Sequence, residues 1–168
     1  MLLPAAILVF VLMIAEAILA ARNDRALRGA GAREPAGDVY RVMQIAYPAS
    51  FAVMLAEGVM RSAAPDAAFW IGAAVFGAGK ALKYWAIATL GPRWTFRVLV
   101  PPGGERIRRG PYRWLAHPNY VGVAGELIGT AIAMRAILSG PLAVTAFIYL
   151  MWRRVAVEET AMRGGGVE

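Results

Sequence analysis

The sequence contains no cysteine and only one histidine. The lack of cysteine excludes disulfide bonds and thiolate metal ligands, and a single histidine cannot build a multi-histidine metal centre, so we expect no metal site. Charged residues are also scarce, at 17% of 168 residues, whereas 59% are hydrophobic and the mean hydropathy is +0.52. An apolar fraction this large is untypical of a soluble domain and indicates a membrane protein.

The apolar residues gather in five runs that are separated by clusters of charge. These runs cover 2–21, 42–60, 67–90, 121–138 and 140–152. A membrane-spanning helix takes about 20 mostly apolar residues, so the fifth run is too short unless its helix continues past Arg153 or forms a re-entrant hairpin. We predict an all-α fold, an integral membrane bundle of about five transmembrane helices.

The first run has an alternative interpretation as a secretory signal, because its alanines at the end resemble a cleavage region. No basic residue precedes the run, and its length suits a full span. Both features favour a transmembrane helix.

Basic residues alternate between the predicted connections. Arginines are frequent in 22–41, in 93–113 and after Trp152, whereas the second and fourth connections hold only Arg61 and Arg135. Because cytoplasmic loops are enriched in Lys and Arg, we predict a multi-pass protein of the inner membrane with its N-terminus outside and its C-terminus in the cytoplasm. The same placement accounts for the net charge of +7, so we expect membrane lipids and no nucleic acid as partners.

The first and third connections differ in composition. Residues 22–38 mix charge with glycine and proline, and we expect a solvated, partly mobile connection without chemistry. Residues 91–120 are rich in turn formers and aromatic residues and end in His117-Pro118-Asn119-Tyr120. A loop of about 30 residues in a compact protein is usually functional or disordered, and its aromatic residues argue against disorder.

A second polar stretch follows the last apolar run. There, Arg154 and Glu158 are four residues apart and project from one helical face. The alternation of loops puts this stretch and His117 on the same side of the membrane, so the two can meet. Taken separately, each has a purely structural explanation, as an interfacial aromatic belt or a salt-bridged helix end.

Several short motifs in these stretches resemble the isoprenylcysteine carboxyl methyltransferase family over about the C-terminal half of the chain. The motifs are Gly110-Pro111-Tyr112, His117-Pro118-Asn119-Tyr120, Gly122 and Arg154-Val155-Ala156-Val157-Glu158-Glu159. Upstream, Lys83-Tyr84-Trp85, Leu90-Gly91 and Arg93-Trp94 resemble a bacterial branch that includes methyltransferases of phenolic or pyrone lipids. The family usually has an arginine before the histidine, where this chain has Ala116, and Arg113 is the candidate substitute.

The resemblance implies S-adenosylmethionine as the cofactor and a lipophilic acceptor that enters from the bilayer. The cofactor-binding residues that it implies are Gly104, Glu105, Arg106, Ile107, Tyr112, His117, Pro118, Asn119, Tyr120 and Glu158. Arg154 would face the acceptor, which in the family is a carboxylate, and a guanidinium fork can hold that group.

Two carboxylates complete the catalytic candidates beside Arg154. Glu159 or His117 would serve as the base if the acceptor were a phenol. Glu126 lies at membrane depth near the expected pocket, where an ionisable group normally faces a cavity or a partner. Pairing of Glu126 with Arg135 or with another helix is the alternative.

We therefore predict one polytopic domain over 1–168, with N-terminal transmembrane helices in 1–90. Residues 91–168 would provide the cofactor-binding loop, a helical hairpin and the C-terminal helix, with the cofactor pocket on the cytoplasmic side. The predicted activity is methyl ester formation on a prenylcysteine-like carboxylate or methylation of a phenolic or pyrone lipid. The alternatives are an NADPH-dependent membrane reductase similar to sterol reductases and a non-catalytic membrane subunit.

Overall fold

The computed structural model describes residues 2–100, 102 and 107–163 and is helical. Its elements are α1 (Leu2–Gly29), α2 (Tyr40–Met60), α3 (Ala67–Leu90), η1 (Gly91–Arg93), η2 (Gly110–Arg113), α4 (Pro118–Ala133) and α5 (Ser139–Arg163). The extended pairing within these residues is a single bridge between Arg33 and Val100, outside any strand. The predicted all-α class with five helices is confirmed.

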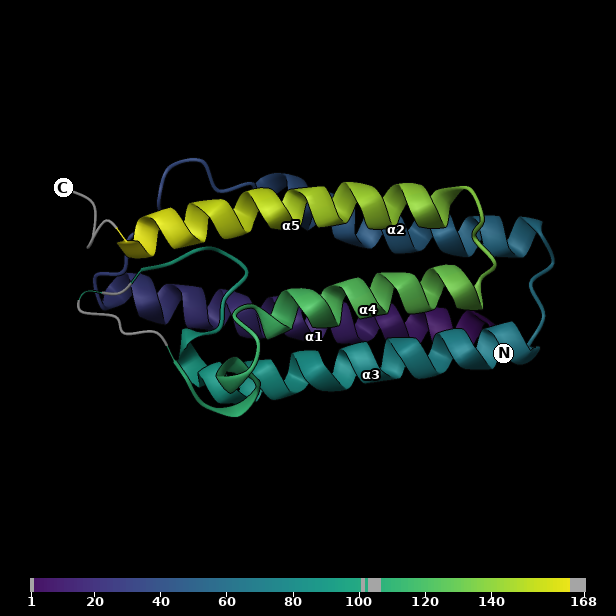
Figure 1. Ribbon diagram of the computed structural model, residues 1–168, viewed down its shortest axis with the longest axis horizontal. Helices are drawn as coiled ribbons and strands as arrows, with labels where there is room; N and C mark the ends of the chain where they lie inside the picture. Colours follow the sequence, from purple (N-terminus) through teal and green to yellow (C-terminus); the bar gives the residue numbers. More distant parts are fainter. Residues whose placement is uncertain (1, 101, 103–106, 164–168) are drawn as a thin grey trace.

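The five helices run up and down along the long axis of the molecule (Figure 1). One end, which we call the loop end, carries the α1–α2 connection, the long α3–α4 connection and the C-terminal part of α5. The opposite end carries the start of α1 and the two short connections, α2–α3 and α4–α5. In Figure 1, α3, α4 and α5 form a front layer, and α1 and α2 lie behind it.

Two helices, α1 and α2, are long and apolar enough to cross a membrane. Helix α5 extends to Arg163, so the helix that contains the fifth apolar run continues past Arg153. This was one of the two predicted alternatives. The fourth helix stops before the end of its apolar run, 121–138, because α4 has 16 residues and ends at Ala133. The chain then turns through Arg135, whose φ of 50° is incompatible with a continuing helix.

Glycines let α3 and α4 approach each other closely. A Cβ atom built on Gly79 would lie 2.7 Å from the carbonyl oxygen of Gly122, and one on Gly129 would lie 2.4 Å from the backbone nitrogen of Phe76. Small residues of this kind permit backbone contact between helices in a membrane. The α3–α4 pair is therefore the most closely packed pair of helices in the bundle. The connection between the two helices lies at the loop end.

We expect Gly129→Ala to destabilise the protein by about 1–3 kcal/mol, the usual cost of inserting a methyl group into a well-packed site. The measurement is denaturant unfolding in detergent micelles. Gly77→Ala is the matched control, because a Cβ at Gly77 has no neighbour within 4 Å. Equal stability of the two variants would contradict the packing described here.

Candidate functional site

A cavity of about 1670 Å³ lies inside the bundle and extends to the loop end. All five helices and the α3–α4 connection contribute to its wall. The residues from the sequence prediction that line it are Ile107, Tyr112, His117, Asn119, Tyr120, Arg154 and Glu158. The structure thus brings most of the described candidate residues together around one space.

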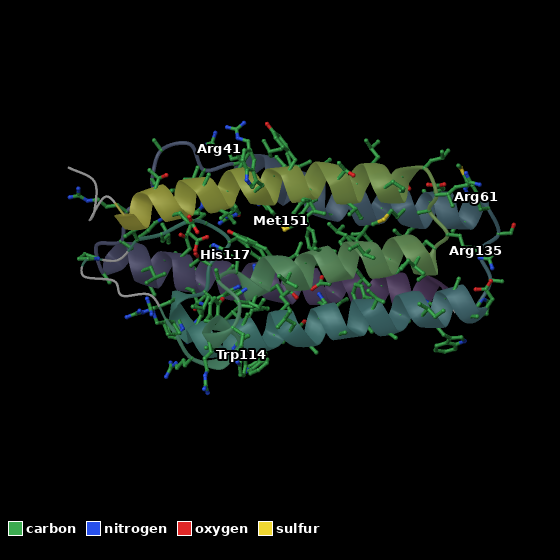
Figure 2. The ribbon with its side chains drawn as sticks, viewed as in Figure 1. Arg41, Arg61, Trp114, His117, Arg135 and Met151 are labelled. Carbon is green, nitrogen blue, oxygen red and sulfur yellow. The ribbon has the colours of Figure 1, made fainter. Side chains whose placement is uncertain are left out.

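His117 and Glu158 are in contact with each other on the wall of this cavity. The His117 Nδ1 atom lies 3.7 Å from the Glu158 Oε2 atom, and His117 Nε2 lies 3.8 Å from Glu159 Oε1. Figure 2 shows His117 at the loop end, between the beginning of α4 and α5. The Nε2 atom is buried and makes no hydrogen bond within the described residues.

Two tyrosines extend the polar wall around Glu158. The Tyr120 hydroxyl donates a hydrogen bond to Glu158 Oε2 at 3.2 Å, and the Tyr120 ring stacks on the His117 ring at a centroid distance of 5.4 Å. Burial, reinforced by the negative charge of Glu158, raises the pKa of Tyr112. The Tyr112 phenol therefore stays protonated at neutral pH and can donate a hydrogen bond.

Arg154 is buried at the inner face of the loop end. Its Nη2 atom donates a hydrogen bond to the Phe96 carbonyl and lies 3.8 Å from Asp38 Oδ2. The Nη1 atom donates to the Met43 sulfur at 3.9 Å. Both terminal nitrogens of Arg154 are thus engaged, and the buried Nε–H is the donor without a hydrogen-bond partner among the described residues.

The α1–α2 connection packs onto the α3–α4 connection, so the segment that the sequence predicted to be solvated is largely exposed but is held by specific contacts. Arg33 and Val100 exchange two backbone hydrogen bonds, of 3.1 and 3.0 Å. Asp38 Oδ2 accepts a hydrogen bond from the Val98 backbone at 3.0 Å. No sequence pattern indicates these contacts, because they join two irregular segments.

Glu34 links the same two connections through ion pairs. Although desolvation opposes ionisation, hydrogen bonds from Arg28 and Arg97 hold the pKa of the Glu34 carboxyl below its usual value. Arg97 Nη1 lies 2.8 Å from Glu34 Oε1. The α1–α2 connection, held in this way, forms part of the cavity wall at the loop end.

Trp94 joins Asn119 at the start of α4 to α1. Its indole Nε1–H donates to Asn119 Oδ1 at 3.4 Å, and its carbonyl accepts a hydrogen bond of 2.8 Å from the Asn23 side chain. Sequence reasoning missed Asn23 and Asp38 as site residues. The sequence signal that was available is an asparagine two residues after the first apolar run.

A buried ionic cluster lies deeper in the bundle, made of Glu16, Lys80, Lys83 and Glu126, with Tyr47 beside it. Glu126 has an exposed fraction of 0%, and its Oε2 atom lies 2.9 Å from Lys80 Nζ and accepts a hydrogen bond from the Tyr47 hydroxyl. Glu16 pairs with Lys80 at 3.1 Å and with Lys83 at 2.5 Å. The two positive and two negative charges balance.

This cluster decides between the alternatives for Glu126. Glu126 pairs with another helix, α3, and the alternative pairing with Arg135 is wrong, because Arg135 pairs with Asp66 at the opposite end of the molecule. Figure 2 shows Arg135 near Arg61 at that end, far from His117. The catalytic role of Glu126 stays a prediction.

The remaining candidate residues have different positions. Pro118 is buried at the start of α4 but is absent from the cavity wall. Glu159 contacts the His117 ring from α5 without lining the cavity. Gly104, Glu105 and Arg106 lie outside the described residues.

Comparisons with known proteins relate this chain to one family and to two bacterial proteins. The model of the isoprenylcysteine carboxyl methyltransferase (ICMT) family matches residues 70–164. The uncharacterized protein YpbQ of Bacillus subtilis is 29% identical over 150 residues, which cover 89% of each chain. An uncharacterized protein of Haemophilus influenzae is 23% identical over 142 residues, which cover 84% of this chain and 83% of that protein. No solved structure matches.

The matched segment contains both halves of the site, since it runs from α3 through the His117 turn to the end of α5. It also covers more than half of the 168 residues. This chain therefore belongs to the isoprenylcysteine carboxyl methyltransferase family, a family of membrane proteins.

Proposed function

We propose that the protein is an S-adenosylmethionine-dependent O-methyltransferase that acts on a lipophilic acceptor within the membrane. The acceptor would be a prenylcysteine-like carboxylate or a phenolic or pyrone lipid. The observation that carries the proposal is the meeting of His117 and Glu158 in one cavity, 3.7 Å apart, although they lie on different elements.

The residues of the cavity fit the cofactor. The Glu158 carboxylate suits its amino group or its ribose hydroxyls, and the Tyr112 ring offers an apolar face. The His117 Nε2 atom, which makes no hydrogen bond among the described residues, can hydrogen-bond to the cofactor. The cavity volume of about 1670 Å³ also exceeds the roughly 300–1,000 Å³ of a pocket for one small ligand. This volume leaves room for the cofactor and an acceptor together.

The chemistry divides between the cofactor and the chain. The bound cofactor supplies a methyl group that its sulfonium makes electrophilic. The chain has to align the acceptor oxygen, keep it anionic and exclude water, and alignment alone contributes about 7–11 kcal/mol. Arg154, with its unpartnered Nε–H, holds an acceptor carboxylate in this scheme. A carboxylate needs no base, whereas a phenol would lose its proton to His117 or Glu159.

The loop end faces the cytoplasm in this proposal, since the arginine-rich connections gather there. The soluble cofactor then enters the cavity from the cytoplasm, while the acceptor enters from the bilayer.

The proposal is tested with the purified full chain in nanodiscs. Retention of labelled S-adenosylmethionine, and methyl transfer to either a prenylcysteine analogue or a long-chain alkyl phenol, are the expected results. Binding of reduced nicotinamide without binding of S-adenosylmethionine would favour the reductase. Binding of neither would leave a non-catalytic subunit.

We expect Arg154→Lys to lower kcat/KM for the acceptor about tenfold, because lysine keeps the charge but loses the planar fork that holds a carboxylate. The dissociation constant of S-adenosylmethionine should not change. Arg153→Lys is the matched control, because the neighbouring Arg153 is exposed and absent from the cavity wall. Acceptor kinetics equal to those of the wild type would exclude this role for Arg154.

A further inference from the structure

Part of the buried ionic cluster reaches the cavity. The side chains of Glu16, Tyr47 and Lys83 lie on the cavity wall, whereas Lys80 and Glu126 do not line it. Both Glu16 and Lys83 are buried, with exposed fractions of 4% and 2%. Ionisable groups within a membrane bundle that face a cavity usually mark the path or the site of a ligand. The cluster therefore has one side that can meet a bound molecule.

The Lys83 ammonium group is incompletely paired. It carries several N–H donors, and one of them donates to Glu16 Oε2 at 2.5 Å. The other oxygens near Lys83 Nζ are the Tyr47 hydroxyl at 3.4 Å and Glu126 Oε1 at 3.5 Å, beyond the usual N–H···O range of about 2.7–3.2 Å. Lys80, in contrast, donates to two carboxylates at 3.1 and 2.9 Å. Lys83 can therefore donate a hydrogen bond to an oxygen atom in the cavity.

The cluster lies deeper in the bundle than the polar residues of the loop end. The Tyr47 ring lies 5.3 Å from the Phe147 ring, measured between centroids, and Phe147 precedes Arg154 by seven residues on α5. At about 1.5 Å per residue, the two positions are about 10 Å apart along the helix. Met43 and Val123 provide apolar wall between them. The cavity thus has two polar regions separated by an apolar stretch.

We propose that Lys83, together with Glu16 and Tyr47, forms a second polar subsite that binds an oxygen atom within the lipophilic chain of the ligand. This oxygen, of a ketone, hydroxyl or ether group, lies about 10 Å from the polar end that meets Arg154, and the Lys83 ammonium group donates to it. A plain hydrocarbon chain leaves that donor without a partner, which disfavours its binding. The subsite therefore selects an oxygenated chain over a plain acyl or prenyl chain. That the ligand is the methyl acceptor rests on the proposed function.

The first test needs no variant. The probes are alkyl phenols of one chain length in which a single ketone is moved along the chain, and their binding to the full chain in nanodiscs is measured without S-adenosylmethionine. When the ketone is about 10 Å from the phenol oxygen, we expect a dissociation constant about tenfold lower than that of the unsubstituted compound, the effect of one hydrogen bond to a charged group. Ketones nearer or farther should give no gain. Equal affinity across the series would overturn the subsite.

The second test exchanges which lysine is lost. The double variants Lys83→Met with Glu16→Gln and Lys80→Met with Glu16→Gln each remove one positive and one negative charge, so the cluster stays balanced in both. Since Lys83 lines the cavity and Lys80 does not, the first variant should bind the ketone and the unsubstituted compound equally, and the second should keep the preference. Circular dichroism checks that both are folded. Loss of the preference in both variants, or in neither, would refute the assignment to Lys83.

Methyl transfer to the same compounds separates this inference from the proposed function. If S-adenosylmethionine is retained and the unsubstituted alkyl phenol is methylated, but the ketone series binds uniformly, the subsite fails and the methyltransferase stands. If one ketone compound binds preferentially but S-adenosylmethionine is not retained, the proposed function fails and the subsite remains.

Discussion

Glu158→Gln is expected to weaken the binding of S-adenosylmethionine about 100-fold, because hydrogen bonds to a charged group contribute about 1.5–3 kcal/mol each. The substitution removes the negative charge but keeps a carbonyl oxygen that can accept the Tyr120 hydrogen bond, which is 3.2 Å long in the wild type. The fold should therefore survive. Isothermal titration calorimetry in detergent measures the change.

Thr160→Ala is the control for this experiment, because Thr160 is exposed on the same helix and bonds only within it, to the Ala156 carbonyl, in the described contacts. Its cofactor affinity should equal that of the wild type. If Glu158→Gln also binds the cofactor as the wild type does, Glu158 is not a cofactor ligand. A loss of thermal stability in the Gln variant would instead indicate a structural role.

Lys83→Met is expected to lower the free energy of unfolding by about 3–5 kcal/mol, the usual effect of removing one partner from a buried ionic pair. Lys83 has an exposed fraction of 2% and contacts Glu16 at 2.5 Å and Glu126 at 3.5 Å. Without it, two buried carboxylates share the single ammonium group of Lys80. Denaturant unfolding in mixed micelles measures the loss.

The double variant Lys83→Met with Glu16→Gln separates charge imbalance from lost packing. It restores the balance of charge around Lys80 and Glu126, so we expect it to recover a large part of the stability that Lys83→Met loses. Stability of Lys83→Met equal to that of the wild type would show that Glu16 and Glu126 do not need a second cation.

The helices could be predicted from the sequence to different degrees. The runs 42–60 and 67–90 became α2 (Tyr40–Met60) and α3 (Ala67–Leu90) almost unchanged. Helix α1 extends beyond its apolar run to Gly29, because an apolar run does not reveal a charged helical turn held by pairs such as Asp24 with Arg28, four residues apart. Helix α4 ends early, at Ala133, because the chain turns at Arg135, whose φ is 50°, and no apolar pattern in the run reveals that turn.

The meeting of His117 with Glu158 was predictable, whereas the anchoring of Arg154 was not. Counting the helical crossings places both ends of the α4–α5 hairpin at the same end of the bundle, and the structure has this arrangement. The contacts of Arg154 with Phe96 and Asp38 join three segments without any periodic pattern. Such contacts depend on how irregular connections fold over one another.

The sequence alone therefore determined the five helices, their order, the family and the end of the bundle where the site residues gather. These follow from local hydrogen bonding, apolar runs and the alternation of direction between successive helices. Only the tertiary structure decided which charges pair and where the cavity opens. Both depend on the rotation of each helix about its axis and on the distance between helices. That distance is short where Gly79 meets Gly122 and long where Glu16 reaches Lys83.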